Sequence, residues 1–332
     1  MNTSSPRRGS LTRLSSVFTA SLSLALAGTL AAQEPAGDLD RTLSILAAGG
    51  PREAGPKNPV TITDLGLELL PVPAGTFLMG SPRSDLLRYT DEPDQATVSL
   101  TRGFWLGKTE VTQGQWEALM GANPSRFSRL GANAPVESVA WADAMAFCEK
   151  LTAREQAAGR LPAGYVYTLP TEAQWEYACR AGTLDPHAGD LDAMAWYSKN
   201  SGITTEIVAQ KQPNAWGFHD MHGNVWEWTY DWHRGGLLGR PAKEGEEELG
   251  AIDPAGPTTG ERRVLRGGAF NMPEAAARSA YRLRLPPTDA KYTIGFRVAL
   301  SVPPDPQPEP PPRPRRQRPP EPDPEAAAAP SP

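Results

Sequence analysis

The chain has 332 residues, of which 39% are hydrophobic, so it is long enough for one large domain or two small ones with a sizeable core. Its formal net charge is −5 with both signs interspersed, which argues against a nucleic-acid-binding protein. The nine Trp residues lie between positions 105 and 232, and we expect the core in that stretch.

Residues 1–32 have the features of a secretory signal peptide. Three Arg residues between positions 7 and 13 precede an apolar run over residues 17–30, and small residues follow at Ala31 and Ala32. The run is too short and too rich in Ser, Thr and Ala to favour a membrane span. We therefore predict a secreted or periplasmic protein with no membrane span after cleavage. An uncleaved anchor and twin-arginine export are the alternatives.

Residues 33–59 mix Gly, Pro, Ala and charged residues, which is typical of a flexible linker. Residues 60–300 are predicted to form one domain of short elements joined by many loops. The expected strands cover residues 97–100, 104–108, 165–168, 263–270 and 292–300, with two more within residues 67–79. The expected helices follow Thr112, cover residues 141–157 and follow Thr171. Strands and helices do not alternate regularly, so the predicted fold class is α+β.

The third of these helices has the clearest boundaries. Thr171 and Gln174 form a capping-box pattern, in which each side chain satisfies a backbone donor of the first turn. Gly182 is a typical C-terminal signal, so we expect the helix to run to Arg180 and to stop at Gly182. Beyond the domain, residues 301–332 are rich in Pro and are predicted to be a disordered tail. Four Arg residues between positions 313 and 318 suit either a solvated tail or a tether to an anionic polymer or an aromatic groove.

Several motifs occur in a fixed order across about 240 residues of the chain. They are PAGTFLMGS at 73–81, EVTQ at 110–113, LPTEAQWEYA at 169–178, DMHGNVWEW at 220–228, RGG at 266–268 and GFR at 295–297. In this order they resemble the motifs of the formylglycine-generating enzyme (sulfatase-modifying factor) family. The resemblance implies a C-type-lectin-like α+β fold with little regular secondary structure.

The resemblance also implies a chemistry that this chain lacks the residues to perform. In the oxidases of the family, two cysteines shortly after the Arg-Gly-Gly motif bind copper(I), for which thiolates are the preferred soft ligands. Here Met272 stands at the first position, and Ala277, or Arg278 if one residue is inserted, at the second. A single thioether does not replace two thiolates. Copper is therefore not expected, and formylglycine synthesis is predicted to be absent.

Hard oxygen ligands are a better prediction. Asp220, the carbonyls of Gly223 and Val225, and the carboxylate of Glu227 lie in one short loop, and Ca²⁺ prefers such oxygens. The resemblance implies a structural calcium at these positions, with Glu110 completing the shell. The alternative is that the carboxylates pair with arginines of the closing strands. A second calcium site of the family has no convincing match in this chain.

The cysteines and histidines allow further interpretations. Cys148 and Cys179 are the only cysteines, and they are either buried apolar residues or a disulfide pair. The resemblance implies disulfide cysteines at both positions, but the usual partners are absent from this sequence. His219 and His222 have a spacing seen in metal sites, although hydrogen bonding within a loop is the simpler interpretation.

Two classes of function follow from these residues. The first is a non-oxidase binding or accessory module of the cell envelope that holds a peptide, protein or glycan. The second is an enzyme of the same fold with a chemistry other than copper-dependent cysteine oxidation. Five arginines near the end of the domain have two possible roles. They either pair with buried carboxylates such as Glu172 and Glu176 or bind anions beside aromatic residues. These arginines are Arg266, Arg278, Arg282, Arg284 and Arg297.

Overall fold

The structure is a computed structural model that describes residues 57–89, 92, 95–235 and 251–304. The predicted signal peptide and nearly all of the predicted linker and tail lie outside the described residues. The strands are β1 (Val60–Ile62), β2 (Leu67–Val72), β3 (Gly75–Met79), β4 (Ala96–Leu100), β5 (Phe104–Gly107), β6 (Val166–Thr168), β7 (Trp226–Trp232), β8 (Ala251–Ile252), β9 (Arg263–Arg266), β10 (Leu283–Leu285), β11 (Ile294–Gly295) and β12 (Ala299–Ser301). The helices are α2 (Gln113–Met120), α3 (Trp141–Ala157), α4 (Glu172–Arg180) and α5 (Leu191–Met194), with 3₁₀ turns η1 (Ser128–Leu130) and η2 (Glu274–Ala277).

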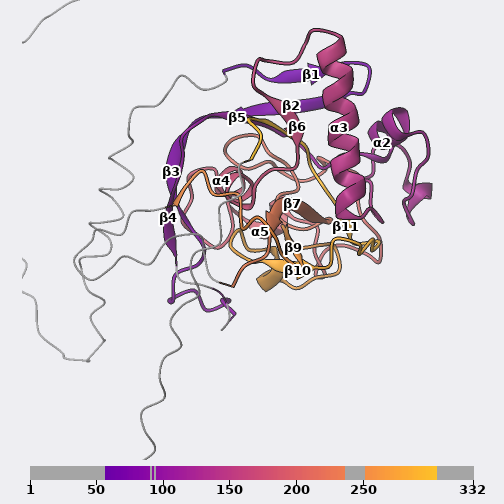
Figure 1. The fold of residues 1–332 in the computed structure, drawn as a ribbon. Helices are drawn as coiled ribbons and strands as arrows, with labels where there is room; N and C mark the ends of the chain where they lie inside the picture. The colour runs from indigo at the N-terminus through magenta and orange to yellow at the C-terminus, as the bar shows by residue number, and fades with distance from the viewer. Residues whose placement is uncertain (1–56, 90–91, 93–94, 236–250, 305–332) are drawn as a thin grey trace, which may run out of the picture. The chain divides into compact units, whose positions relative to one another are not determined.

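The strands form three small sheets. A five-stranded sheet has the order β1-β2-β5-β12-β6, a four-stranded sheet has the order β10-β9-β7-β11, and β3-β4-β8 form the third. Helix α3 runs beside the first sheet and contacts β6 and α2, while α4 contacts β3, β7 and β9 (Figure 1). Both parallel and antiparallel pairs occur, and strands and helices do not alternate regularly among the described residues. The predicted α+β class is confirmed.

Local capping explains where the helices begin. The hydroxyls of Thr112 and Thr171 each accept a hydrogen bond from the backbone N–H three residues later. In both cases the Gln at that later position accepts, through its side chain, a hydrogen bond from the backbone N–H of the Thr. Helix α3 has no hydroxyl at its first position, but Asp143 accepts from the backbone N–H of Ala140 at 2.9 Å. Helix α4 runs to Arg180, as predicted, and ends there because Ala181 takes the left-handed conformation, with φ of 46°.

Two of the predicted strands are shorter than expected. The strand predicted over 263–270 stops at Arg266, because Gly267 and Gly268 have φ of 95° and 84°, which a strand does not adopt. The stretch 292–300 forms two strands in different sheets, β11 and β12, rather than one. The chain therefore passes from one sheet to another at Phe296 and Arg297, and this transition places Arg297 inside the molecule.

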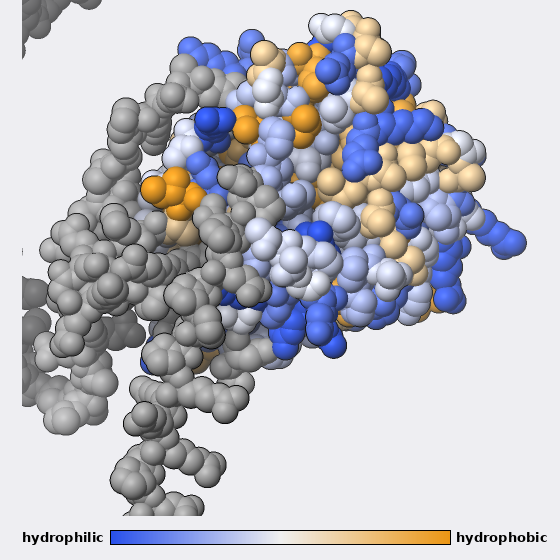
Figure 2. Space-filling view, viewed as in Figure 1, coloured by the Kyte–Doolittle hydropathy of each residue, from blue (hydrophilic) through white to orange (hydrophobic). Residues whose placement is uncertain are grey.

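The core has two large parts. One joins α2 and α3 to the first sheet and to β7, and includes Trp116, Phe147, Trp228 and Phe296. The other joins β3, β4 and α4, with Trp175 fully buried at its centre. The face shown in Figure 2 is mainly hydrophilic, with small hydrophobic areas scattered among polar residues. Within the described ranges, no helix has the length and apolar character needed to cross a membrane.

Candidate functional site

The loop before β7 follows a path that only certain residues allow. Asp220 and Asn224 both have φ of 58°, a left-handed conformation that short polar side chains tolerate. Gly223 has φ of 102°, and a Cβ at this position would lie 2.0 Å from the carbonyl oxygen of Trp196. The side chain of Asn224 accepts from the backbone N–H of Glu206 at 2.9 Å, which ties the loop to its neighbour. Together these contacts turn the carboxylate of Asp220 inward, where it is 2% exposed.

The carboxylates of Glu110, Asp220 and Glu227 and the guanidinium of Arg297 form one buried cluster beside this loop. Arg297 donates to both carboxylate oxygens of Glu227, at 2.6 Å each, and the indole N–H of Trp175 donates to Glu227 at 2.7 Å. Arg297 and Glu227 are completely buried, as is Glu110. The carboxylates of Glu110 and Asp220 interact electrostatically with Arg297 and with each other. The structure thus brings the predicted acidic residues into one buried cluster, with an arginine that belongs to the closing GFR motif.

Glu110 and Asp220 are less well satisfied than Glu227. Neither carboxylate oxygen of Glu110 has a hydrogen-bond partner among the described residues, and Oδ1 of Asp220 has none either. Burial raises the pKa of Glu110 well above its usual range, and the nearby Asp220 raises it further. Burial also raises the pKa of Asp220 to about 6, although its Oδ2 accepts from the backbone N–H of Ala209 at 2.7 Å. One arginine serves three acids, so the site has an excess of negative charge when all are ionised.

This charge excess bears on the predicted calcium site. The orphaned oxygens of Glu110 and Asp220 are hard ligands of the kind that a divalent cation accepts, so these residues fit the ion. Glu227 fits less well, because Arg297 and Trp175 already occupy its oxygens. Among the described residues, no three acidic, His or Cys side chains are arranged to hold a metal on their own. A cation here would therefore depend on backbone carbonyls, such as those of Gly223 and Val225.

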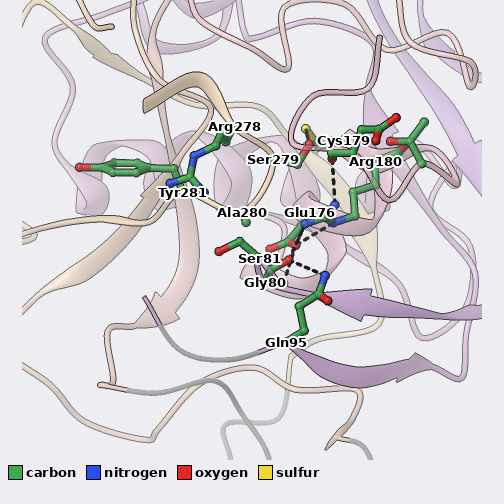
Figure 3. A network of polar contacts seen from close by, with 12 residues as sticks. Gly80, Ser81, Gln95, Glu176, Cys179, Arg180, Arg278, Ser279, Ala280 and Tyr281 are labelled. Atoms are coloured by element: carbon green, nitrogen blue, oxygen red, sulfur yellow. Dashed lines mark hydrogen bonds and ion pairs between the residues drawn. The ribbon is translucent and has the colours of Figure 1, made fainter. Parts of the chain in front are cut away.

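Two further arginines of the predicted set, Arg266 and Arg282, pair with acids, as one of the two interpretations predicted. Arg282 forms a two-pronged contact with Glu172 at 2.5 and 2.8 Å, and Arg266 pairs with Glu176. Glu176 also accepts from Arg180 at 2.8 Å and from the backbone N–H of Gly80 at 2.8 Å (Figure 3). One carboxylate therefore joins α4 to the end of β9 and to the residue that follows β3. Except for Glu176 and Arg180, which are four residues apart on α4, these pairs lie far apart in the sequence and carry little signal there.

The segment that follows Arg-Gly-Gly is packed into the protein. Met272 lies against the first core, and Ala277 is 1% exposed against Leu191, Ala195 and Tyr197. The positions where the family oxidases carry their thiolates therefore hold apolar side chains in contact with other apolar side chains.

The two cysteines are free and buried, so the structure shows the buried-thiol interpretation rather than the disulfide. Cys179 lies 3.8 and 3.9 Å from the ring nitrogens of His222 and 3.5 Å from the hydroxyl of Ser279. Burial raises the pKa of the Cys179 thiol to about 12, and burial lowers the pKa of His222 to about 3, with His187 adding to that decrease. The pair is therefore a neutral thiol beside a neutral imidazole, which is not an activated nucleophile.

The predicted His219 and His222 pair does not form a metal site. Nδ1 of His222 lies 2.7 Å from the carbonyl oxygen of Ala277, and its Nε2 accepts from the backbone N–H of Ala188 at 3.1 Å. Nδ1 of His219 lies 2.9 Å from the carbonyl oxygen of Lys211. Hydrogen bonding within loops, the simpler interpretation, accounts for both rings.

Fold and buried ion pairs together define an α+β domain of the formylglycine-generating enzyme type, with the arginines of its closing motifs turned inward. Residues 58–302 match the family described as "Sulfatase-modifying factor enzyme 1-like domain", and the chain belongs to this family. It is 30% identical to the "Chaperone protein LppX" of Paenibacillus barcinonensis over 242 residues, covering 58% of this chain and 80% of that protein. It is 27% identical to the "Formylglycine-generating enzyme" of Mus musculus over 314 residues, covering 74% of this chain and 77% of that enzyme.

A solved structure supports the fold independently. "Treponema denticola variable protein 1" is 29% identical, with a TM-score of 0.61, and the match covers 74% of this chain and 99% of that one. The family therefore contains relatives named for chaperone and enzyme roles, so family membership alone does not assign an activity to this chain.

Proposed function

We propose that this protein is a binding or accessory module of the cell envelope and not a copper-dependent cysteine oxidase. The observation that carries the proposal is the apolar packing of Met272 and Ala277, which leaves no thiolate pair for copper(I) after the Arg-Gly-Gly motif. The free cysteines do not replace that pair, because each is buried, and burial raises the pKa of both thiols. A relative named as a chaperone supports an accessory role, and a peptide, protein or glycan is the proposed partner.

The test of the oxidase exclusion is direct. Purified full chain is loaded with copper and incubated under air with a peptide that contains Cys-x-Pro-x-Arg, and the peptide is then analysed by mass spectrometry. We expect an unmodified peptide. Formation of an aldehyde at the cysteine would refute the proposal and would favour the alternative class, an enzyme of the same fold.

Export is the second part of the proposal, and it rests on the Arg-flanked apolar run in residues 1–32. We expect the native protein outside the cytoplasm with its N-terminus near Gln33. N-terminal sequencing of protein recovered from cell fractions tests this. A chain that begins at Met1 and stays in the cytoplasm would contradict it.

We also propose that Ca²⁺ binds beside the loop of residues 220–227 and stabilises the fold without taking part in chemistry. Glu110 and Asp220 would supply carboxylate oxygens, because these atoms have no other partner among the described residues. An ion that binds only the folded state raises the free energy of unfolding by about 2.7 kcal/mol at about 100 times its dissociation constant. Bound calcium would also remove the cost of holding two ionised acids together in a buried site.

Melting curves in calcium and in chelator test this site. We expect the wild-type midpoint to rise with calcium and the Glu110→Gln midpoint to stay nearly unchanged. Glu274→Gln is the matched control, because Glu274 belongs to the 3₁₀ turn η2 and not to the buried cluster. Glu227→Gln is less informative, since it would also disturb the contact with Arg297. If calcium moves none of the midpoints and no ion is found in the protein, the arginine pair alone holds the loop.

A further inference from the structure

The connection between β3 and β4 is described at residues 80–89, 92 and 95, and these residues are here called the acidic loop. Its base is fixed to α4. The backbone N–H of Gly80 donates to Glu176 at 2.8 Å, and the carbonyl of Gly80 accepts from Arg180 at 2.7 Å and from Gln95 at 3.2 Å (Figure 3). Beyond this base the loop extends away from the paired strands, as the indigo chain below β4 shows in Figure 1.

Away from its base, the acidic loop contacts one buried arginine of a distant segment. Arg278 donates to both carboxylate oxygens of Glu92 and, at 3.0 Å, to Asp85. The hydroxyl of Ser81 donates to Glu92 at 2.5 Å. Arg278 has no exposed surface, while the side chains of Asp85 and Glu92 are 4% and 7% exposed. Two carboxylates of the loop therefore cover a single guanidinium.

Hydrophobic burial contributes little to holding this loop in place. Leu86 is 99% exposed, Leu87 is 37% exposed and Tyr89 is 41% exposed. The ring of Tyr89 approaches Tyr281 edge-on, with 5.1 Å between ring centroids, and the guanidinium carbon of Arg278 lies 6.0 Å from the centroid of the Tyr89 ring. Ionic contacts with Arg278 thus help to attach the outer part of the loop to the domain.

We propose that Arg278 is a binding residue for the carboxylates of an acidic peptide, and that the acidic loop occupies this residue in the free protein. The present occupant is itself a stretch of peptide, and the groups with which it contacts Arg278 are two carboxylates and an aromatic ring, which are the chemistry that the site accepts. A two-pronged Arg–carboxylate contact has a geometry that Asp or Glu of another chain reproduces. Displacement of the loop would also uncover Tyr281 for an incoming side chain. This inference rests on the proposed binding function and names the ligand class for it.

The loop also explains why binding should be weak until the loop is released. Because the loop is part of the same chain, its carboxylates compete at a high effective concentration, which is on the order of millimolar for short linkers. Removing the two charges removes that competition and leaves the base of the loop in place. We therefore expect the double variant Asp85→Asn/Glu92→Gln to bind an external acidic peptide at least about tenfold more tightly than the wild type.

The experiment uses the full chain and fluorescein-labelled hexaglutamate, followed by fluorescence anisotropy. Hexaglutamine is the control peptide, and Asp289→Asn is the control variant, because Asp289 pairs with Lys291 away from the acidic loop. In the double-variant background, Arg278→Gln should abolish binding, and Arg278→Lys should weaken it because lysine lacks the planar fork. In the wild type, hexaglutamate should speed tryptic cleavage after the exposed Arg83.

Equal affinities of the wild type and the double variant for hexaglutamate would overturn the inference, as would binding that survives Arg278→Gln. If substitution of Arg278 prevents folding, the inference is tested only by comparing the affinities of the wild type and the double variant for hexaglutamate. If the protein does not bind hexaglutamate and forms no aldehyde, the inference about Arg278 is wrong, but the proposed non-oxidase function still stands. If the protein forms the aldehyde, the proposed non-oxidase function is wrong, whatever the result of the hexaglutamate titration.

Discussion

Asp231 offers a quantitative test of how burial controls the stability of this domain. It lies on β7 with 1% of its surface exposed, and its Oδ2 accepts from the backbone N–H of Glu172 at 2.7 Å, at the start of α4. Its Oδ1 has no partner among the described residues. The charged groups that act on it are Glu172, Arg282 and Arg263. Burial, followed by the carboxylate of Glu172, raises the pKa of Asp231 to about 8.

A raised carboxyl pKa makes the folded state hold its proton more tightly than the unfolded state does. The resulting stability is complete below the ordinary pKa of 3.8 and is lost as the pH rises through about 8. Between these limits the loss is about 1.4 kcal/mol for each pH unit. From pH 5 to pH 7, Asp231 should therefore remove about 3 kcal/mol from the free energy of unfolding.

The substitution Asp231→Asn isolates this contribution, because an amide oxygen still accepts from Glu172 and the amide does not ionise. Urea unfolding of both proteins at pH 5 and pH 7 gives the difference between them at each pH. We expect this difference to shift by about 3 kcal/mol in favour of the variant at the higher pH. Asp289→Asn, at a partly exposed position, is the matched control. A difference that is the same at pH 5 and pH 7 would refute the argument.

Three further substitutions test other contacts. Arg297→Met leaves Glu227 buried without its partner and should lower the free energy of unfolding in urea by about 3–5 kcal/mol. A decrease below about 1 kcal/mol would mean that the pair is not isolated from water. Ala181→Gly relieves a left-handed residue at the end of α4 and should raise stability by about 1 kcal/mol in thermal unfolding; destabilisation would contradict the strain. Gly75→Ala places a Cβ 2.1 Å from the hydroxyl of Tyr177 and should cost about 1–3 kcal/mol, partly restored by Tyr177→Phe.

Sequence reasoning succeeded where the cause of a structure lies within a few residues. The capping box of Thr171 and Gln174 predicted the start of α4, because both partners belong to the same turn. Strand ends were less predictable. The end of β9 depends on the positive φ of Gly267 and Gly268, and a strand pattern does not show which glycines adopt it. The positions of the elements were therefore predictable from nearby residues, whereas the lengths of the strands depended on backbone conformations that the sequence pattern does not show.

The candidate site shows the same division between local and distant causes. The acids of the 220–227 loop were visible in the sequence as a cluster, but the partner of Glu227 is Arg297, 70 residues later. The contact of Asp85 with Arg278 spans 193 residues. Nothing in the spacing of a single sequence identifies such pairs, since many arginines and acids are available to each other. Only the packing of β3, α4 and the closing strands selects the partners.

The distribution of these pairs also explains how the domain keeps its fold without the family's thiolates. Arg266, Arg282 and Arg297 each bind a carboxylate inside the molecule, and the contacts join α4 and β7 to the closing strands. None of these pairs involves Met272 or Ala277, which pack only as apolar side chains. Removing one partner of a buried pair would cost several kcal/mol, whereas exchanging a cysteine for a small apolar residue in a packed position costs little. The ion pairs that join α4 and β7 to the closing strands are therefore independent of the side chains at positions 272 and 277.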